Sequence, residues 1–282
     1  MRTAVTINPL TLKDALKAKA RKDVVCVAGG TDVLVKLHDM IDRPWPPLLV
    51  LDEVDSLRRV DPSGKRLVLG PLVTFAEIAE SPALRRFAPQ LVEAAALASS
   101  PPIRNRATIG GNLANGSPSG DLIPPLYVLG ATLELSSVKG KRRVDVQDFF
   151  TGPGLTILRH DELITSISFE RSGGSGFFNR LAVRKALAVS KVSVAADIAL
   201  RKKTVAQVRI ALGAVAPTVI RATRTEEFLA GRELSARSIA AACDLIKGEA
   251  RPIDDIRSTA EYRREMVGVL FRRGLEEIAR AV

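Results

Sequence analysis

The residues best suited to binding chemistry lie between Arg104 and Pro125, in a stretch that reads RNRATIGGNLANGSPSGDLIPP. Its adjacent glycines, Gly110 and Gly111, allow a positive φ and let the backbone approach a ligand with no Cβ in the way. Successive backbone N–H groups in such a turn can converge on an anion. The short polar side chains that follow suit phosphate and sugar hydroxyls: Asn112, Asn115, Ser117, Ser119 and Asp121. Clusters of this composition also form plain surface turns, so both interpretations stay open for this stretch alone.

A second glycine pair occurs near the N-terminus, where residues 24–35 read VVCVAGGTDVLV. An apolar run leads into Gly29 and Gly30, and apolar residues resume after Asp32. This pattern predicts a strand, a glycine-rich turn and a short helix, an arrangement that points N–H groups at a phosphate. Two such turns could clamp a diphosphate from two sides.

Composition limits the class of protein. The chain has 282 residues, 46% of them hydrophobic, which is enough for one large domain or two ordinary ones and argues against disorder. Cys26 and Cys243 are far apart, which argues against an iron–sulfur cluster, a zinc site or a secreted disulfide framework. The N-terminus lacks an apolar signal region and no apolar run is long enough to span a bilayer, so we expect a cytoplasmic protein.

The chain is strongly basic, with a formal net charge of +11. From residue 171 onward there are 21 Lys and Arg against 12 Asp and Glu, so the excess is concentrated in the C-terminal part. The positive residues are scattered with acids between them, and aromatic residues make up only 4%. We therefore predict a solvated or partner-facing surface and no nucleic-acid partner.

Apolar periodicity predicts the elements that position the two glycine segments. Helices are expected at residues 11–21, 75–79, 89–99 and 121–129, with Thr11 and Thr74 as N-caps, and Pro101 and Pro102 are expected to end the third helix. Strands are expected at 24–28, 48–51, 67–69 and 162–169, with a hairpin of 131–136 and 141–146. A G-x-G at 152–154 lacks the third glycine and the strand–turn–helix setting of a dinucleotide fingerprint.

The chain changes character after residue 171. Residues 172–176 read SGGSG, the most flexible-looking stretch, and we place a domain boundary there. Strands at 177–180, 186–200 and 205–213 are followed by helices at 223–229, 235–247 and 260–278. Strands with helices on one side form an α+β layer.

The segments AGGTD at 28–32 and ATIGGNLANGSPSGD at 107–121 together resemble the two pyrophosphate-binding segments of the FAD-binding subunits of molybdenum hydroxylases. That family includes the medium subunit of carbon monoxide dehydrogenase and the flavin domain of xanthine dehydrogenase. Towards the C-terminus, GAVAPT at 213–218 and STAEYR at 258–263 also resemble family segments. The resemblance covers essentially the whole chain.

The resemblance implies an α+β protein. It implies a PCMH or vanillyl-alcohol-oxidase-type FAD-binding domain at 1–172, made of two α/β subdomains at about 1–52 and 53–172. A small CO dehydrogenase flavoprotein-like C-terminal domain, with an antiparallel sheet and helices, would follow at 177–282.

The resemblance also implies the site residues. Ala28, Gly29, Gly30, Thr31 and Asp32 would lie along the pyrophosphate, and Thr108, Gly110, Gly111, Asn112 and Asn115 would face it from the other side. Asp121 would bond a hydroxyl of the cofactor, and Ile164 would pack on its ring system. Arg180 would lie near the flavin's pyrimidine edge, where many relatives carry lysine. Other roles stay open: Thr31 or Asp32 as a helix N-cap, Asp121 as the cap of the next helix, and Arg180 as a surface arginine.

The chain shows no obvious acid–base dyad, and its two histidines, His38 and His160, sit in no convincing nucleophile–base pair or metal-ligand spacing. The resemblance implies a noncovalent FAD in a heteromeric molybdenum hydroxylase. A small [2Fe-2S] ferredoxin-like subunit would deliver electrons from a large molybdopterin subunit, and FAD would pass them to NAD, quinone or oxygen. The resemblance implies that another subunit recognises the substrate of the complex, so the sequence of this chain does not identify it. Two alternatives remain, a self-contained FAD oxidase or reductase and a non-catalytic basic binding module.

Overall fold

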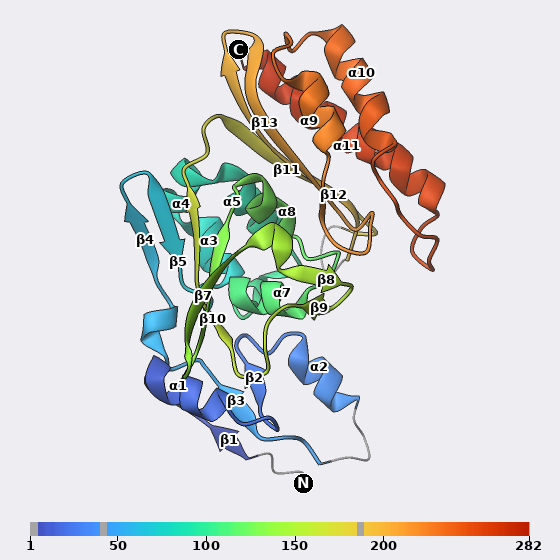
Figure 1. Cartoon of the computed structure of the whole chain (residues 1–282). Helices are drawn as coiled ribbons and strands as arrows, with labels where there is room; N and C mark the ends of the chain where they lie inside the picture. Colours follow the sequence, from blue (N-terminus) through green and yellow to red (C-terminus); the bar gives the residue numbers. More distant parts are fainter. Residues whose placement is uncertain (1–4, 40–43, 185–188, 282) are drawn as a thin grey trace.

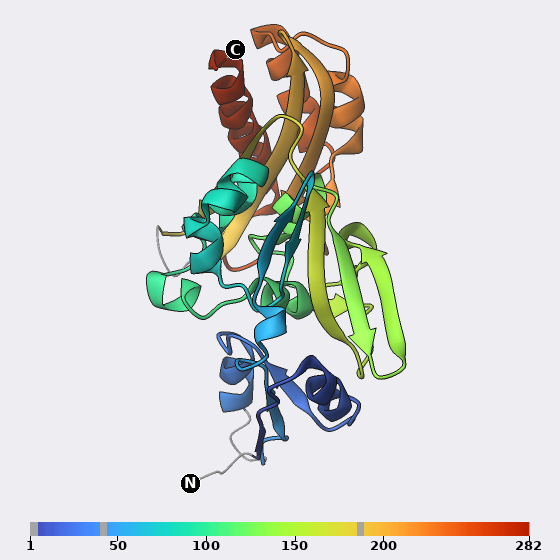
Figure 2. The same cartoon turned by 90° about the vertical axis from the view of Figure 1, so that its left-hand side faces the viewer.

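The computed structural model describes residues 5–39, 44–184 and 189–281. The molecule is elongated, with the N-terminal elements at one end and the C-terminal helices at the other, as both views show (Figures 1 and 2). Three layered units follow one another along the chain. Within the described ranges no helix combines the length and the apolar character needed to cross a bilayer.

The N-terminal unit is a small parallel sheet with two helices. The strands lie in the order β1 (Thr6–Ile7), β3 (Leu48–Val50), β2 (Val25–Val27). Helix α1 (Leu12–Lys19) begins where Thr11 accepts a hydrogen bond from the Asp14 amide, so the predicted N-cap is confirmed. Helix α2 (Val33–His38) follows β2 directly.

The middle unit contains a five-stranded antiparallel sheet. Its order is β4 (Val60–Ser63), β5 (Arg66–Leu69), β10 (Leu163–Glu170), β6 (Thr132–Ser137), β7 (Gly140–Asp145). The buried face packs in one core with the helices of this unit. These helices are α3 (Phe75–Glu80), α4 (Pro82–Phe87), α5 (Pro89–Leu97), α6 (Pro101–Arg104), α7 (Ile109–Asn115) and α8 (Ile123–Val128). Short connections complete it: η1 (Asp55–Leu57), η2 (Val146–Asp148), β8 (Phe150–Gly152) and β9 (Leu155–Thr156).

Local signals predicted this unit well, with one exception. Thr74 forms a full capping box with Glu77, and the predicted hairpin is present as β6 and β7. Pro101 and Pro102 were expected only to end a helix, but they open helix α6. A proline in a first turn lacks only an N–H that has no helical partner, so it can begin a helix as readily as it follows one.

The C-terminal unit is a four-stranded antiparallel sheet with a helical layer. The order is β11 (Ser175–Ala182), β12 (Ser190–Arg201), β13 (Thr204–Gly213), β14 (Ile220–Arg221). Helices α9 (Thr223–Leu229), α10 (Ala236–Lys247) and α11 (Ala260–Arg280) cover one face (Figure 1). Residues 186–188 of the predicted strand lie outside the described residues.

The other face of this sheet is also covered. Phe178, Ala195 and Ala211 belong to the core of the middle unit, together with residues of α5 and α8. Side chains alternate across a strand, so neighbouring Phe177 packs in the opposite core with α11. The C-terminal sheet is therefore a shared wall between two cores.

The stretch expected to be most flexible is held at several points. The Ser172 hydroxyl lies 2.6 Å from Oδ1 of Asp197, and Ser175 already starts β11. A Cβ on Gly174 would lie 1.9 Å from the Ile198 carbonyl oxygen, so this glycine serves close packing. The placement of a domain boundary at this stretch stays a prediction.

Candidate functional site

A cleft of about 720 Å³ lies between the N-terminal and middle units. All of the predicted site residues except Arg180 line it. They are the residues of the two glycine segments, together with Asp121 and Ile164 of β10. The cleft is thus where segments almost 80 residues apart meet. Its volume is typical of small-molecule sites, which run from about 300 to 1,000 Å³.

The first glycine segment is the turn between β2 and α2. Gly30 has φ 78°, a left-handed conformation that favours glycine. The amides of Gly29, Gly30 and Thr31 donate to no other residue that the structure describes. A Cβ on Gly29 would lie 1.8 Å from the Arg106 carbonyl oxygen, so the two glycine segments touch backbone to backbone. The turn therefore offers three successive donors beside the cleft.

The second glycine pair works differently from expectation. Gly110 and Gly111 lie in helix α7 and neither has a positive φ. Gly110 instead allows close packing, because its Cβ would lie 2.4 Å from Cβ of Pro71. A Cβ on Gly111 would meet only Oγ1 of Thr108, at 3.0 Å, within the described structure. Gly111 thus leaves space free on the cleft side.

Two polar groups around α7 prepare the cleft for a ligand. Thr108 caps the helix, and its Oγ1 accepts the Gly111 amide at 3.1 Å. Oδ1 of Asn112 is buried and has no hydrogen-bond partner among the described residues. An unpaired buried acceptor costs about 1–3 kcal/mol, so a ligand that donates to Asn112 would gain this contact.

Lys36, which was not among the predicted site residues, joins the two segments. Its Nζ lies 2.7 Å from Oδ2 of Asp32 and 2.7 Å from Oδ1 of Asn115. Asp32 occupies the N-cap position of α2, but its side chain makes no capping bond and pairs with Lys36 instead. The spacing of four residues between Asp32 and Lys36 is the only sequence signal for this contact.

A buried ion pair closes another part of the cleft wall. Arg180 Nη1 lies 2.8 Å from Oδ2 of Asp121, and these side chains are only 6% and 9% exposed. The Ser190 hydroxyl donates to the other carboxylate oxygen at 2.6 Å. Burial raises the pKa of Asp121 above its ordinary value, and Arg180 and Ser190 oppose that rise. The alternative roles considered for these two residues are therefore wrong, since Asp121 does not cap α8 and Arg180 is not a surface residue.

Arg180 does not line the cleft itself, but it binds residues that do or that lie next to them. Its Nη2 donates to the carbonyl of Leu97, two residues before Ser99, which lines the cleft with φ 51°. Ser190, which the sequence analysis did not identify, also lines the cleft from β12. The C-terminal sheet therefore supplies part of the wall and holds two loops of the middle unit in place.

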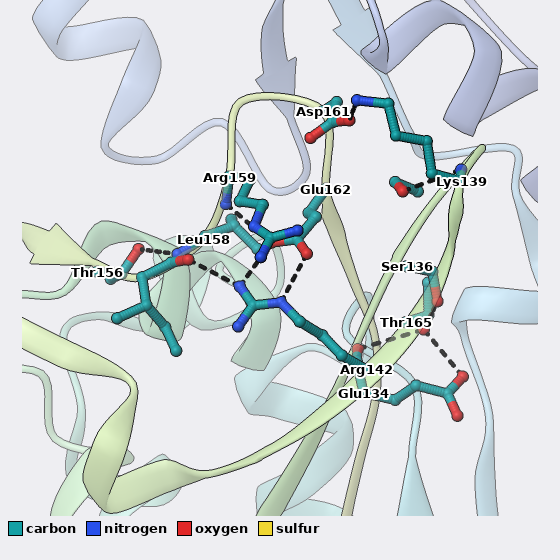
Figure 3. A network of polar contacts seen from close by, with 12 residues as sticks. Glu134, Ser136, Lys139, Arg142, Thr156, Leu158, Arg159, Asp161, Glu162 and Thr165 are labelled. Atoms are coloured by element: carbon teal, nitrogen blue, oxygen red, sulfur yellow. Dashed lines mark hydrogen bonds and ion pairs between the residues drawn. The ribbon is translucent and has the colours of Figure 1, made fainter.

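A polar network around Glu162, which lines the cleft two residues before Ile164, fixes this part of the wall (Figure 3). Arg142 on β7 binds Glu162 through two bonds of 2.7 and 2.8 Å, and the Arg159 amide donates to Glu162 at 2.9 Å. The hydrogen bond from Arg142 holds the pKa of Glu162 below its ordinary value. Arg142 also donates to the Ile157 carbonyl at 2.8 Å. The loop before β10, which contributes Leu158 to the cleft, is thereby anchored to the sheet.

Comparisons with known proteins agree along the whole chain. The family model for the FAD binding domain in molybdopterin dehydrogenase matches residues 2–169, and that for the CO dehydrogenase flavoprotein C-terminal domain matches residues 178–278.

Among curated proteins, the chain is similar to a putative xanthine dehydrogenase FAD-binding subunit of Escherichia coli (strain K12), with 31% identity over 96% of this chain and 94% of that protein. It is also similar to the nicotine 6-hydroxylase medium subunit of Paenarthrobacter nicotinovorans, with 32% identity over 96% and 95%. Among solved structures, a chain of the carbon monoxide dehydrogenase of Hydrogenophaga pseudoflava superposes with a TM-score of 0.92 at 27% identity, covering 100% of this chain and 99% of that one.

Proposed function

Because this chain belongs to the family of FAD-binding subunits of the molybdopterin-dependent dehydrogenases and hydroxylases, we propose that it holds one noncovalent FAD in the cleft and passes electrons from a partner to an external acceptor. The chain is a flavoprotein subunit of an oxidoreductase, similar to xanthine dehydrogenase and carbon monoxide dehydrogenase subunits. Its α+β fold is that of the carbon monoxide dehydrogenase chain. The place of the protein in the cytoplasm stays a prediction.

The cleft suits FAD on chemical grounds. The three unpaired amides at Gly29, Gly30 and Thr31 match the oxygens of a diphosphate. The unpaired Oδ1 of Asn112 matches a hydroxyl or N–H donor, of which FAD has several. Gly111 lets a ligand approach α7 without meeting a side chain. The juxtaposition of the two glycine segments around one cleft is the observation that carries the proposal.

Each predicted residue then has a role. The backbone of Ala28, Gly29, Gly30, Thr31 and Asp32 binds the diphosphate on one side, and Thr108, Gly110, Gly111, Asn112 and Asn115 face it on the other. Ile164 packs against a ring of the cofactor. Asp121 accepts a bond from a cofactor hydroxyl, since a carboxylate already bonded to Arg180 and Ser190 still has free lone pairs. Arg180 acts by orienting Asp121.

When bound, FAD supplies the one- and two-electron chemistry that protein side chains lack. This chain contributes position, electrostatics and exclusion of water. We propose that the electrons come from [2Fe-2S] clusters of a small ferredoxin-like subunit, which is served in turn by a large molybdopterin subunit. The acceptor is NAD, quinone or oxygen. The names of several relatives as medium subunits or medium chains support an assembly of this kind.

Electron delivery by a partner can be tested without knowing the substrate. The FAD-loaded chain is mixed with a chemically reduced [2Fe-2S] ferredoxin-like subunit of the proposed class, and the visible flavin band is followed in a stopped-flow spectrometer. We expect the flavin band to bleach rapidly when the reduced partner is added. Xanthine or nicotine added without the partner should cause no bleaching. A flavin that the partner cannot reduce, or an isolated chain that oxidises such donors by itself, would contradict the proposal.

A further inference from the structure

We propose that Lys36 is a diphosphate-binding residue of the cleft and contributes positive charge beside the glycine turn. The inference rests on the proposed FAD site and adds to it a side chain that neither the sequence pattern nor the similarity assigned. It concerns a charge, whereas the other diphosphate ligands proposed above are backbone amides and short neutral groups.

The charge balance of the cleft favours a role for Lys36. Among its described lining residues, the cationic side chains are Lys19 and Lys36, and the anionic ones are Asp32, Asp121 and Glu162. Asp121 and Glu162 are already paired with Arg180 and Arg142. Asp32 pairs with Lys36 itself. A diphosphate would add two negative charges to a cleft whose described cationic lining side chains are Lys19 and Lys36, so we expect one of these two to contact it.

The positions of the two lysines distinguish Lys36 from Lys19. Lys19 is the last residue of α1 and lines the cleft near Cys26 of β2, before the glycine turn. The Nζ of Lys36 instead lies between the two glycine segments, because it contacts Asp32 on one and Asn115 on the other. A diphosphate bound between these segments would have Lys36 within reach.

Lys36 can exchange its present partner for a ligand at little cost in free energy. Its side chain is 66% exposed and its partner Asp32 is 51% exposed. Exposed ion pairs contribute little to stability, so exchanging Asp32 for a phosphate oxygen loses little. A charge-assisted bond from an ammonium group to phosphate is stronger than a bond between neutral groups.

The test separates charge from structure with two variants. Lys36→Gln keeps a donor for Asn115 but removes the charge, and Lys36→Arg keeps the charge. Lys17→Gln is the matched control, since Lys17 also pairs with an aspartate on the same helix, is 61% exposed, and does not line the cleft. The apo chain of each is titrated with FAD and with ADP, and its Tm is measured.

We expect Lys36→Gln to raise the Kd for FAD and for ADP about tenfold, the effect of losing one charge-assisted bond, with an unchanged Tm. The Kd values of Lys36→Arg should stay within about threefold of wild type. Between about 0.01 and 1 M salt the Debye length falls from about 30 to about 3 Å, so the salt dependence of Kd should be smaller in Lys36→Gln than in wild type. Lys17→Gln should match wild type.

Two results would overturn the inference. One is Lys36→Gln binding FAD and ADP as tightly as Lys17→Gln. The other is an equal loss in Lys36→Gln and Lys36→Arg with a lowered Tm, which would make Lys36 a structural link between α2 and α7. A wild-type chain that binds neither FAD nor ADP would instead contradict the proposed site itself.

Discussion

The Gly111→Val protein is expected to fold normally and to lose FAD binding, with Kd raised about 100-fold or more. Within the described structure a Cβ at position 111 lies 3.0 Å from Oγ1 of Thr108, so this hydroxyl must shift by a few tenths of an ångström, and the valine methyl groups would add bulk to the cleft wall that Gly111 lines. This bulk would occupy space that the cofactor needs against α7. The residue has no positive φ and lies in a helix, so the substitution adds no backbone strain.

Fluorescence titration with FAD and thermal unfolding together measure this effect. Gly173→Val is the matched control, because Gly173 also has no positive φ and a Cβ there meets nothing within 4 Å. We expect the control to bind FAD as wild type does, and both variants to unfold near the wild-type Tm. Normal FAD affinity in a stable Gly111→Val protein would show that α7 does not contact the cofactor.

The second large effect is expected from Arg180→Met. This substitution leaves the Asp121 carboxylate buried without its counterion, and losing one partner of a buried ion pair typically costs about 3–5 kcal/mol of unfolding free energy. Arg21→Met is the control, since Arg21 pairs with Asp23 at 3.0 Å but is 54% exposed, and exposed pairs of that kind contribute little to stability. Urea unfolding of both proteins gives the comparison.

The pH dependence identifies the cause. Burial already raises the pKa of Asp121, and removing Arg180 removes an opposing influence, so the pKa rises further. A raised carboxyl pKa favours the folded state only where the group is protonated, so the destabilisation should be largest near neutral pH and shrink as the pH falls. Adding Asp121→Asn to Arg180→Met removes the unpaired buried charge, so the double variant should recover part of the lost unfolding free energy. A loss independent of pH, with no recovery in the double variant, would contradict the ion-pair explanation.

Features encoded over a few residues could be predicted from the sequence. Thr11 and Thr74 cap helices because the acceptor and its amide are three residues apart, and the hairpin of β6 and β7 follows from alternation around a glycine turn. The two glycine segments were recognised for the same reason. Their meeting in one cleft followed from the resemblance, not from either segment alone.

Contacts between distant residues could not be predicted in this way. Arg180 and Asp121 are 59 positions apart, and Ser190 and Asp121 are 69 apart, so no local pattern shows that they form one buried cluster. Lys36 meets Asn115 across 79 positions. The glycine pair of α7 was expected to use conformational freedom, but Gly110 is needed for packing against Pro71, a neighbour that only the folded chain reveals.

The central claim is that this chain binds FAD noncovalently in the cleft, and the most direct test is the flavin content of the purified wild-type protein. The chain is saturated with FAD, freed of excess by gel filtration, and then precipitated with acid. We expect a yellow protein that releases one FAD per chain into the supernatant. A folded, colourless chain that takes up no FAD, or flavin that stays with the precipitate, would contradict the account.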